Sequence, residues 1–154
     1  MSESRRWPAH TNVLDRYVLL ISGKRTRSVA RYCLASDEWK EISELNQARV
    51  SASACSLSGS AYVFGGRDDS DDFLNTIEKL GSFASLSAAT TESGPLHSWK
   101  VIELPTDLLT PRNSAAFGPL NSHEIAILGG VRDNIFLKDV FVFDTETETV
   151  KKVF

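Results

Sequence analysis

The sequence is short of cysteine, histidine and long apolar runs, and these shortages exclude several classes of protein. Its 154 residues include only two cysteines and three histidines, so neither a disulfide framework nor a zinc-binding histidine cluster is expected. No apolar run approaches the roughly 20 residues that span a bilayer. The formal net charge of −3 at pH 7 argues against electrostatic binding to nucleic acid. We therefore expect neither a nucleic-acid partner nor a membrane partner.

Signals of secretion are also absent. Residues 2–8 lack the apolar segment of a signal peptide, and the sequence contains no Asn-X-Ser/Thr glycosylation motif. The two cysteines, Cys33 and Cys55, lie in strand-like patterns, where we expect them to be small buried apolar residues. The predicted location is the cytoplasm.

Catalytic and cofactor motifs are missing as well. The sequence has no Gly-X-Ser-X-Gly, phosphate-binding P-loop or His-Glu-X-X-His pattern. The three histidines, His10, His97 and His123, show no metal-ligand spacing among themselves. We therefore predict that the protein is not an enzyme and that it holds no cofactor or metal.

What the sequence does contain is a glycine signal that recurs after short apolar runs. It reads Ser22-Gly23, Gly65-Gly66 and Gly129-Gly130. An arginine precedes each copy at nearly constant distance: 17 residues from Arg6 (23 − 6), 17 from Arg49 (66 − 49) and 18 from Arg112 (130 − 112). A repeat of this period indicates a repeat architecture.

Each unit is predicted to form four short strands. The first strand is rich in small residues, and the second is the nearly continuous apolar run before the glycines, which is typical of a strand buried on both faces. The third alternates, and the fourth begins at Trp39, Trp99 or Val150. The tryptophans should pack between neighbouring sheets, and the recurring arginines could bond or stack with them.

This order of glycines, tryptophans and arginines resembles the kelch repeat, which forms one blade of a β-propeller. The resemblance covers almost the whole chain, with Ser22 and Val150 as departures from the pattern. It implies an all-β propeller segment of three four-stranded antiparallel blades, too few to close a ring alone. The predicted N-terminal tail is 1–5, and the three predicted blades are 6–48, 49–111 and 112–154. The second blade contains a predicted insertion at about 81–98.

The function implied by the resemblance is protein–protein interaction, as a scaffold or adaptor with an unknown protein partner. Ubiquitin-ligase substrate receptors and cytoskeletal scaffolds are two such roles in the family. Since propellers usually have about four to eight blades, we expect a fragment or remnant of a longer propeller; the alternative is a homodimer of six blades. The competing class is a carbohydrate-active or sugar-isomerising propeller enzyme.

Two loops of opposite charge are the candidate docking site. The turn after the first glycine signal is basic, and the turn after the second is acidic. We expect both turns on one face of the propeller, together with Arg132, where they would either dock a partner or serve only as solvated turns. The aspartate run lacks the glycine and glutamate of an EF-hand, so no calcium site is predicted. The docking residues are Lys24, Arg25, Arg27, Arg67, Asp68, Asp69, Asp71, Asp72 and Arg132.

Overall fold

A computed structural model of the chain describes residues 5–81 and 98–154, and these residues form three four-stranded antiparallel sheets and one small hairpin. The predicted insertion at about 81–98 falls almost entirely outside them. Within the described ranges there is no helix, and hence none long and apolar enough to cross a membrane. The first sheet contains β1 (Ala9–Val13), β2 (Tyr17–Gly23), β3 (Thr26–Cys33) and β4 (Glu38–Ile42).

The other two sheets repeat the same up-and-down order along the chain. The second contains β5 (Ser53–Leu57), β6 (Ser60–Phe64), β7 (Thr76–Leu80) and β8 (Trp99–Glu103). The third contains β9 (Ala116–Pro119), β10 (Glu124–Leu128), β13 (Val140–Asp144) and β14 (Thr149–Lys152). The hairpin is formed by β11 (Val131–Arg132) and β12 (Ile135–Phe136), between β10 and β13.

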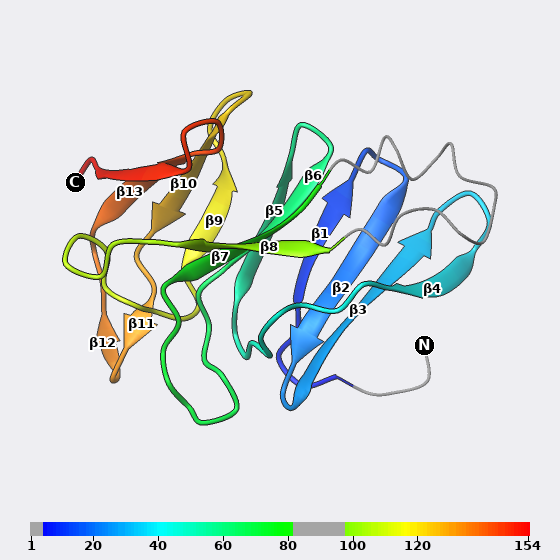
Figure 1. The fold of residues 1–154 in the computed structure, drawn as a ribbon, viewed down its shortest axis with the longest axis horizontal. Helices are drawn as coiled ribbons and strands as arrows, with labels where there is room; N and C mark the ends of the chain where they lie inside the picture. Colours follow the sequence, from blue (N-terminus) through cyan, green and yellow to red (C-terminus); the bar gives the residue numbers. More distant parts are fainter. Residues whose placement is uncertain (1–4, 82–97) are drawn as a thin grey trace.

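The three sheets stand next to one another like adjacent blades of a fan, as Figure 1 shows. The first strands β1, β5 and β9 are the inner ones, since β5 contacts both β1 and β9. The sheets do not close into a ring. This confirms the predicted all-β propeller segment of three antiparallel blades.

The glycine signal ends the second strand of each sheet, and in the first two sheets it also joins that sheet to the next. Gly66 has a φ of +91°, and a Cβ there would lie 2.9 Å from the carbonyl oxygen of Val50. Only glycine tolerates both this conformation and this close approach. The amide of Gly23 donates to the Arg49 carbonyl at 3.1 Å, and that of Gly66 donates to the Arg112 carbonyl at 2.9 Å. Each bond links one sheet to its successor.

Two apolar clusters fill the junctions between the sheets. The first lies between the first and second sheets and includes Leu19, Leu45 and Trp99. The second lies between the second and third sheets and includes Phe64 and Phe143. Trp99 is only 4% exposed, and its indole N–H donates to the carbonyl of Ser43 at 2.9 Å. Trp99 therefore packs between sheets as predicted.

Trp39 differs from this prediction because it does not pack between two sheets. It stands at the same position of the first sheet as Trp99 in the second, paired with Tyr32 as Trp99 is paired with Leu80. It is nevertheless 41% exposed, with its ring 5.1 Å from that of Tyr32. The physical reason is the position of its sheet: no described sheet lies on that side of it.

Arg49 is buried and pairs with a carboxylate, not with a tryptophan. Its guanidinium donates to Glu78 at 3.2 Å and to the carbonyl of Gly65 at 3.0 Å. The Glu78 carboxylate also accepts from the amides of Asn46 at 2.7 Å and Gln47 at 3.2 Å. Burial lowers the pKa of Arg49, and the charge of Glu78 opposes that shift. The pair is stable in the interior because neighbouring groups satisfy both partners.

Arg112 repeats this arrangement in the third sheet. Its guanidinium donates to Asp139 at 2.5 Å and to the carbonyl of Gly129 at 2.8 Å, and it lies 5.3 Å from the ring centre of Phe141. Both arginines thus bind the carbonyl of the first glycine in their own sheet. The expectation that the arginines bond or stack with tryptophan is wrong for both.

In the first sheet the structure places Arg5, rather than Arg6, at the position of these arginines. The carbonyls that face Gly23, Gly66 and Gly130 belong to Arg6, Val50 and Asn113. The residue before each of these is Arg5, Arg49 or Arg112. Arg5 donates to the carbonyls of Leu20 and Ser28, whereas the Arg6 guanidinium lies over the ring of Trp7. Although Arg5 falls in the predicted tail, its side chain binds the first sheet.

The cysteines differ in burial. Cys55 is buried in the second apolar cluster, as expected from its strand pattern. Cys33 is only half-buried at the end of β3, where it packs against the first apolar cluster. Both thiols are free.

Candidate functional site

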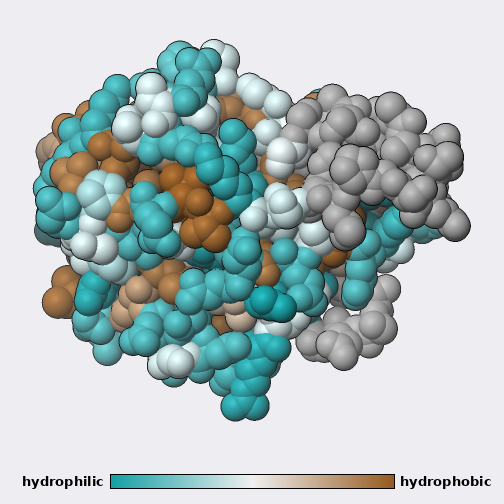
Figure 2. All heavy atoms as spheres, viewed as in Figure 1, coloured by the Kyte–Doolittle hydropathy of each residue, from teal (hydrophilic) through white to brown (hydrophobic). Residues whose placement is uncertain are grey.

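Loops from all three sheets meet at one end of the molecule, the lower edge in Figure 1. We call this end the loop face. It consists of the β2–β3 turn with the start of β3, the β6–β7 loop, and the β11–β12 hairpin, at residues 24–27, 67–73 and 131–136. Figure 2 shows mainly hydrophilic residues along this edge. The predicted docking residues all lie in these three segments.

The basic turn and the acidic loop touch each other. The backbone amide of Arg25 donates to the carboxylate of Asp69 at 3.2 Å. Arg27 forms an ion pair with Glu44 at 3.0 Å, outside the predicted set. Lys24, Arg25 and Asp69 are exposed. The structure therefore brings charges of opposite sign together in one exposed patch, while part of the basic charge is neutralised within the chain.

The aspartate run is a structured turn. One carboxylate oxygen of Asp68 accepts from the amides of Ser70 at 2.9 Å and Asp72 at 3.0 Å. The other accepts from the Gln47 amide at 3.3 Å. Asp71 adopts a left-handed φ of +67° and pairs with Arg67 at 3.4 Å. Because Asp68 is used to build the turn, the outward-facing carboxylates are those of Asp69, Asp71 and Asp72.

An aromatic residue that sequence reasoning missed joins the second and third sheets at this face. The guanidinium of Arg67 lies 5.8 Å from the ring centre of Phe73, and that of Arg132 lies 5.6 Å from it. Two arginines from different sheets thus hold one phenyl ring by cation–π contacts. Arg132 also pairs with Asp133 at 3.3 Å. This contact places the predicted residues Arg67 and Arg132 next to each other.

The β11–β12 hairpin was also missed. Its tip, Asp133-Asn134, has a φ of +50° and of +63°, which is the conformation of a two-residue hairpin turn. The signal in the sequence is an Asp-Asn pair between Val131-Arg132 and Ile135-Phe136. The hairpin leaves Ile135 64% exposed and Phe136 79% exposed.

At the opposite end, His123, Glu124 and Asp144 bring their ligand atoms within 4.8 Å of one another. Lys151 and Asn121 hydrogen-bond to Glu124 and lower its pKa. The backbone amides of Thr147 and Glu146 lower the pKa of Asp144. The two carboxylates are thus already compensated by groups of the chain, and Lys151 would repel a cation.

The chain is similar to kelch-repeat proteins. The Kelch motif family matches residues 48–80. Among curated proteins, the chain is 28% identical over 151 residues to "Kelch repeat protein C2" of Vaccinia virus (strain Western Reserve) and to the proteins of that name in Cowpox virus (strain GRI-90 / Grishak) and Camelpox virus (strain CMS). Each match covers 93% of this chain and 26% of the relative. The chain thus spans about a quarter of the length of the curated relatives it matches.

Proposed function

We propose that this chain, which is similar to kelch-repeat proteins, is a protein-interaction module whose loop face binds a partner protein. The similarity to kelch-repeat proteins supports an interaction module in general. The loop face adds a location, because loops of all three sheets lie there and exposed charges of opposite sign come into contact there. The roles of ubiquitin-ligase substrate receptor and cytoskeletal scaffold both require such a surface.

The observation that carries the proposal is the rigid presentation of charge at this face. Asp68 orders the 67–73 loop through two backbone amides, and the two arginines hold Phe73 in place. A partner would therefore meet Lys24, Asp69 and Asp71 on loops that are already ordered. Preordered loops lose less conformational entropy on binding, which strengthens an interaction for a given contact area.

Mixed charge favours a partner surface that is itself polar and carries both signs. Exposed charges of this kind affect the association rate and the choice of partner more than the final affinity. We therefore expect binding to weaken with added salt, because exposed charges are screened beyond a Debye length of about 8 Å at physiological ionic strength.

The inner strands support an interaction module over the sugar-processing alternative. Glycosidases use a pair of carboxylates that flank the scissile bond. The strands β1, β5 and β9 read AHTNV, SACSL and AFGP, without an aspartate or glutamate. Strands of this composition provide no such pair for chemistry at the inner edge.

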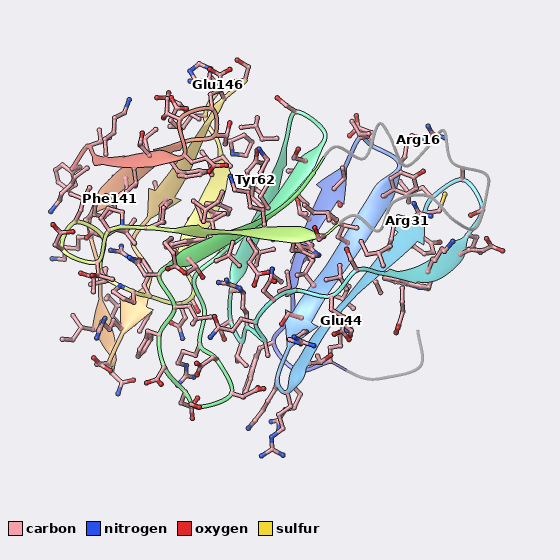
Figure 3. All side chains as sticks on the ribbon, viewed as in Figure 1. Arg16, Arg31, Glu44, Tyr62, Phe141 and Glu146 are labelled. Atoms are coloured by element: carbon pink, nitrogen blue, oxygen red, sulfur yellow. The ribbon has the colours of Figure 1, made fainter. Side chains whose placement is uncertain are left out.

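The test is affinity capture with the purified chain, followed by mass spectrometry of the proteins retained. Asp71→Lys and Arg27→Glu each reverse one exposed charge of the loop face. Glu146→Lys is the matched control, since Glu146 is exposed at the opposite end of the molecule (Figure 3). We expect proteins bound by the wild type and by Glu146→Lys to be lost from both loop-face variants. Equal retention by all four chains would reject the loop face as the docking site.

A further inference from the structure

We call the face of a sheet that points towards the preceding sheet in chain order its leading face, and the face that points towards the following sheet its trailing face. The leading face of the first sheet and the trailing face of the third therefore both point away from the second sheet. On the first sheet this leading face holds Val18, Tyr32 and Trp39, a row that corresponds by strand register to Ala61, Leu80 and Trp99 of the second sheet. On the third sheet the trailing face holds Ala126, Leu128 and Val140, which correspond to Leu19, Ile21 and Val29 of the first. Trp39 is 41% exposed and Leu128 is 43% exposed.

The junctions within the chain show what each kind of face packs against. In the first junction, the trailing row Leu19, Ile21 and Val29 is aliphatic, with Tyr17 further along the same face, and the residue that meets it from the next outer strand is Trp99. In the second junction, the trailing row contains the larger rings of Tyr62 and Phe64, and the outer-strand residue that meets it is Val150. At the outer strand a large residue on one side is thus matched by smaller ones on the other, as the density of protein interiors requires. On the third strand of the second junction, by contrast, Phe141 and Phe143 pack in the same cluster as Tyr62 and Phe64.

The free faces at the two ends satisfy the same rule for the outer-strand residue. The trailing face of the third sheet has the smallest residues of the three, with Ala126 where the other sheets have Leu19 and Tyr62. Such a face leaves room for a large outer-strand residue. The leading face of the first sheet supplies one in Trp39.

The loops at the same two ends are also complementary. Arg132 of the third sheet covers Phe73 of the second. Phe136 is the counterpart of Phe73. Each precedes a leucine whose amide donates to the carbonyl of the second glycine in the glycine pair of its own sheet. Arg25 is the counterpart of Arg132. The amide of the residue before Arg25 donates to the carbonyl of Arg6, and the amide of the residue before Arg132 donates to the equivalent carbonyl of Asn113. Phe136 is 79% exposed, and an arginine placed like Arg25 of a further sheet would cover it.

The backbone bonds that join successive sheets stop at the third sheet. The amide of Ser51 donates to the Trp7 carbonyl at 3.2 Å, and that of Ser114 donates to the Ser51 carbonyl at 2.9 Å. The amides of Gly23 and Gly66 donate in the opposite direction, towards the next sheet, to the carbonyls of Arg49 and Arg112. Within residues 5–81 and 98–154, the amide of Gly130 has no corresponding backbone acceptor.

We propose that the trailing face of one copy of this chain packs on the leading face of a second copy, and that two such junctions close a ring of six sheets. Trp39 of each copy lies over the Ala126 face of the other, and Arg25 covers Phe136. Six sheets fall within the usual four to eight of propellers. A head-to-tail contact that closes after two copies gives a twofold ring, whereas one that does not close gives a filament.

The experiment is the mass of the purified chain by light scattering after size-exclusion chromatography. The expected mass is 2 × 17.0 = 34.0 kDa. Trp39→Glu and Leu128→Glu alter opposite ends of the molecule, and each should halve the mass to 17.0 kDa. Leu120→Glu is the matched control, since Leu120 is 57% exposed in the β9–β10 turn, away from both faces. It should stay at the mass of two copies.

Circular dichroism distinguishes dissociation from unfolding, and both substituted side chains are already partly exposed. If Trp39→Glu lost the β-sheet spectrum of the wild type, Leu128→Glu alone would decide. A wild-type mass of one copy, or of more than two, would overturn the proposal. So would a dimer that survives Leu128→Glu, because it would show that leading faces pair with each other. These masses are measured without any partner, so they do not depend on the loop-face proposal.

Discussion

Trp99 and Trp39 occupy the same position in successive sheets, and their surroundings differ completely. Trp99 is 4% exposed between two sheets, and Trp39 is 41% exposed on the outside of the first. The same contrast separates the buried pair Arg49–Glu78 from the exposed pair Arg27–Glu44. A repeat residue is thus buried to the extent that a neighbouring sheet covers it, and in a repeat protein we expect its contribution to stability to follow that burial.

The largest effect is expected from breaking the buried ion pair. Glu78→Leu leaves the Arg49 guanidinium buried without its carboxylate and should lower the free energy of unfolding by about 3–5 kcal/mol. Denaturant unfolding measures the loss. Glu44→Leu removes the partner of an exposed arginine and should change stability by less than about 1 kcal/mol. Equal losses in the two variants would contradict the contrast between junction and surface.

The tryptophans allow the same comparison with an apolar side chain. Trp99→Ala should cost about 3–5 kcal/mol, because it opens a cavity in the first junction and leaves the Ser43 carbonyl without its donor. Trp39→Ala should cost much less when both changes are made in the Leu128→Glu background, which removes the contribution of dimerisation. Thermal and denaturant melts of the two double variants give the difference. Similar costs would mean that Trp39 is covered in solution.

A smaller effect is expected at the glycine signal. In Gly66→Ala the new Cβ would lie 2.9 Å from the Val50 carbonyl at a φ of +91°, and backbone strain of this kind costs about 1–3 kcal/mol. Gly118→Ala is the control, since a Cβ there meets nothing within 4 Å. Its stability should match that of the wild type in the same melts.

The smallest effect on stability concerns the thiols, whose reactivities should differ strongly. Hydrogen bonds from Ser36 and nearby backbone lower the pKa of Cys33, whereas burial raises the pKa of Cys55 to about 12. Since the thiolate is the reactive form, an alkylating reagent near pH 8 should label Cys33 in the folded chain and Cys55 only after unfolding. Peptide mass mapping identifies the labelled residue. Early labelling of Cys55 would show that the second apolar cluster opens readily.

The raised pKa of Cys55 also sets the sign of a pH effect. Above the ordinary thiol pKa, the unfolded chain loses the Cys55 proton while the folded chain keeps it. The folded state then binds more protons, so stability should fall as pH rises from about 9 towards 12. Cys55→Ala should reduce this slope, and an unchanged slope would assign it to other groups.

Much of the architecture was predictable from the sequence because its signals are local. The pairs at Gly65 and Gly129, the apolar run before each pair and the alternation in 140–143 depend on backbone conformation and strand burial within one repeat. The register of the first arginine was not predictable from spacing alone. Spacings of 17, 17 and 18 residues select Arg6. The Arg6 carbonyl, however, faces Gly23 as the Val50 carbonyl faces Gly66, so Arg6 corresponds to Val50 and not to Arg49.

The candidate site was predicted only in part. Charge patterning identified the two loops, and the contact between Arg25 and Asp69 shows that they meet. The ring of Phe73 between two arginines and the exposed Phe136 were missed, because each depends on residues more than one strand away.

The sequence by itself determined the repeat, the four strands of each unit and the places where only glycine fits, since these follow from short-range backbone geometry. Tertiary structure alone decided that Trp99 is buried and Trp39 exposed, that Arg49 finds Glu78, and that loops of three sheets form one face. The physical reason is that burial and pairing are properties of two sheets in contact, and no pattern within one repeat contains its neighbour.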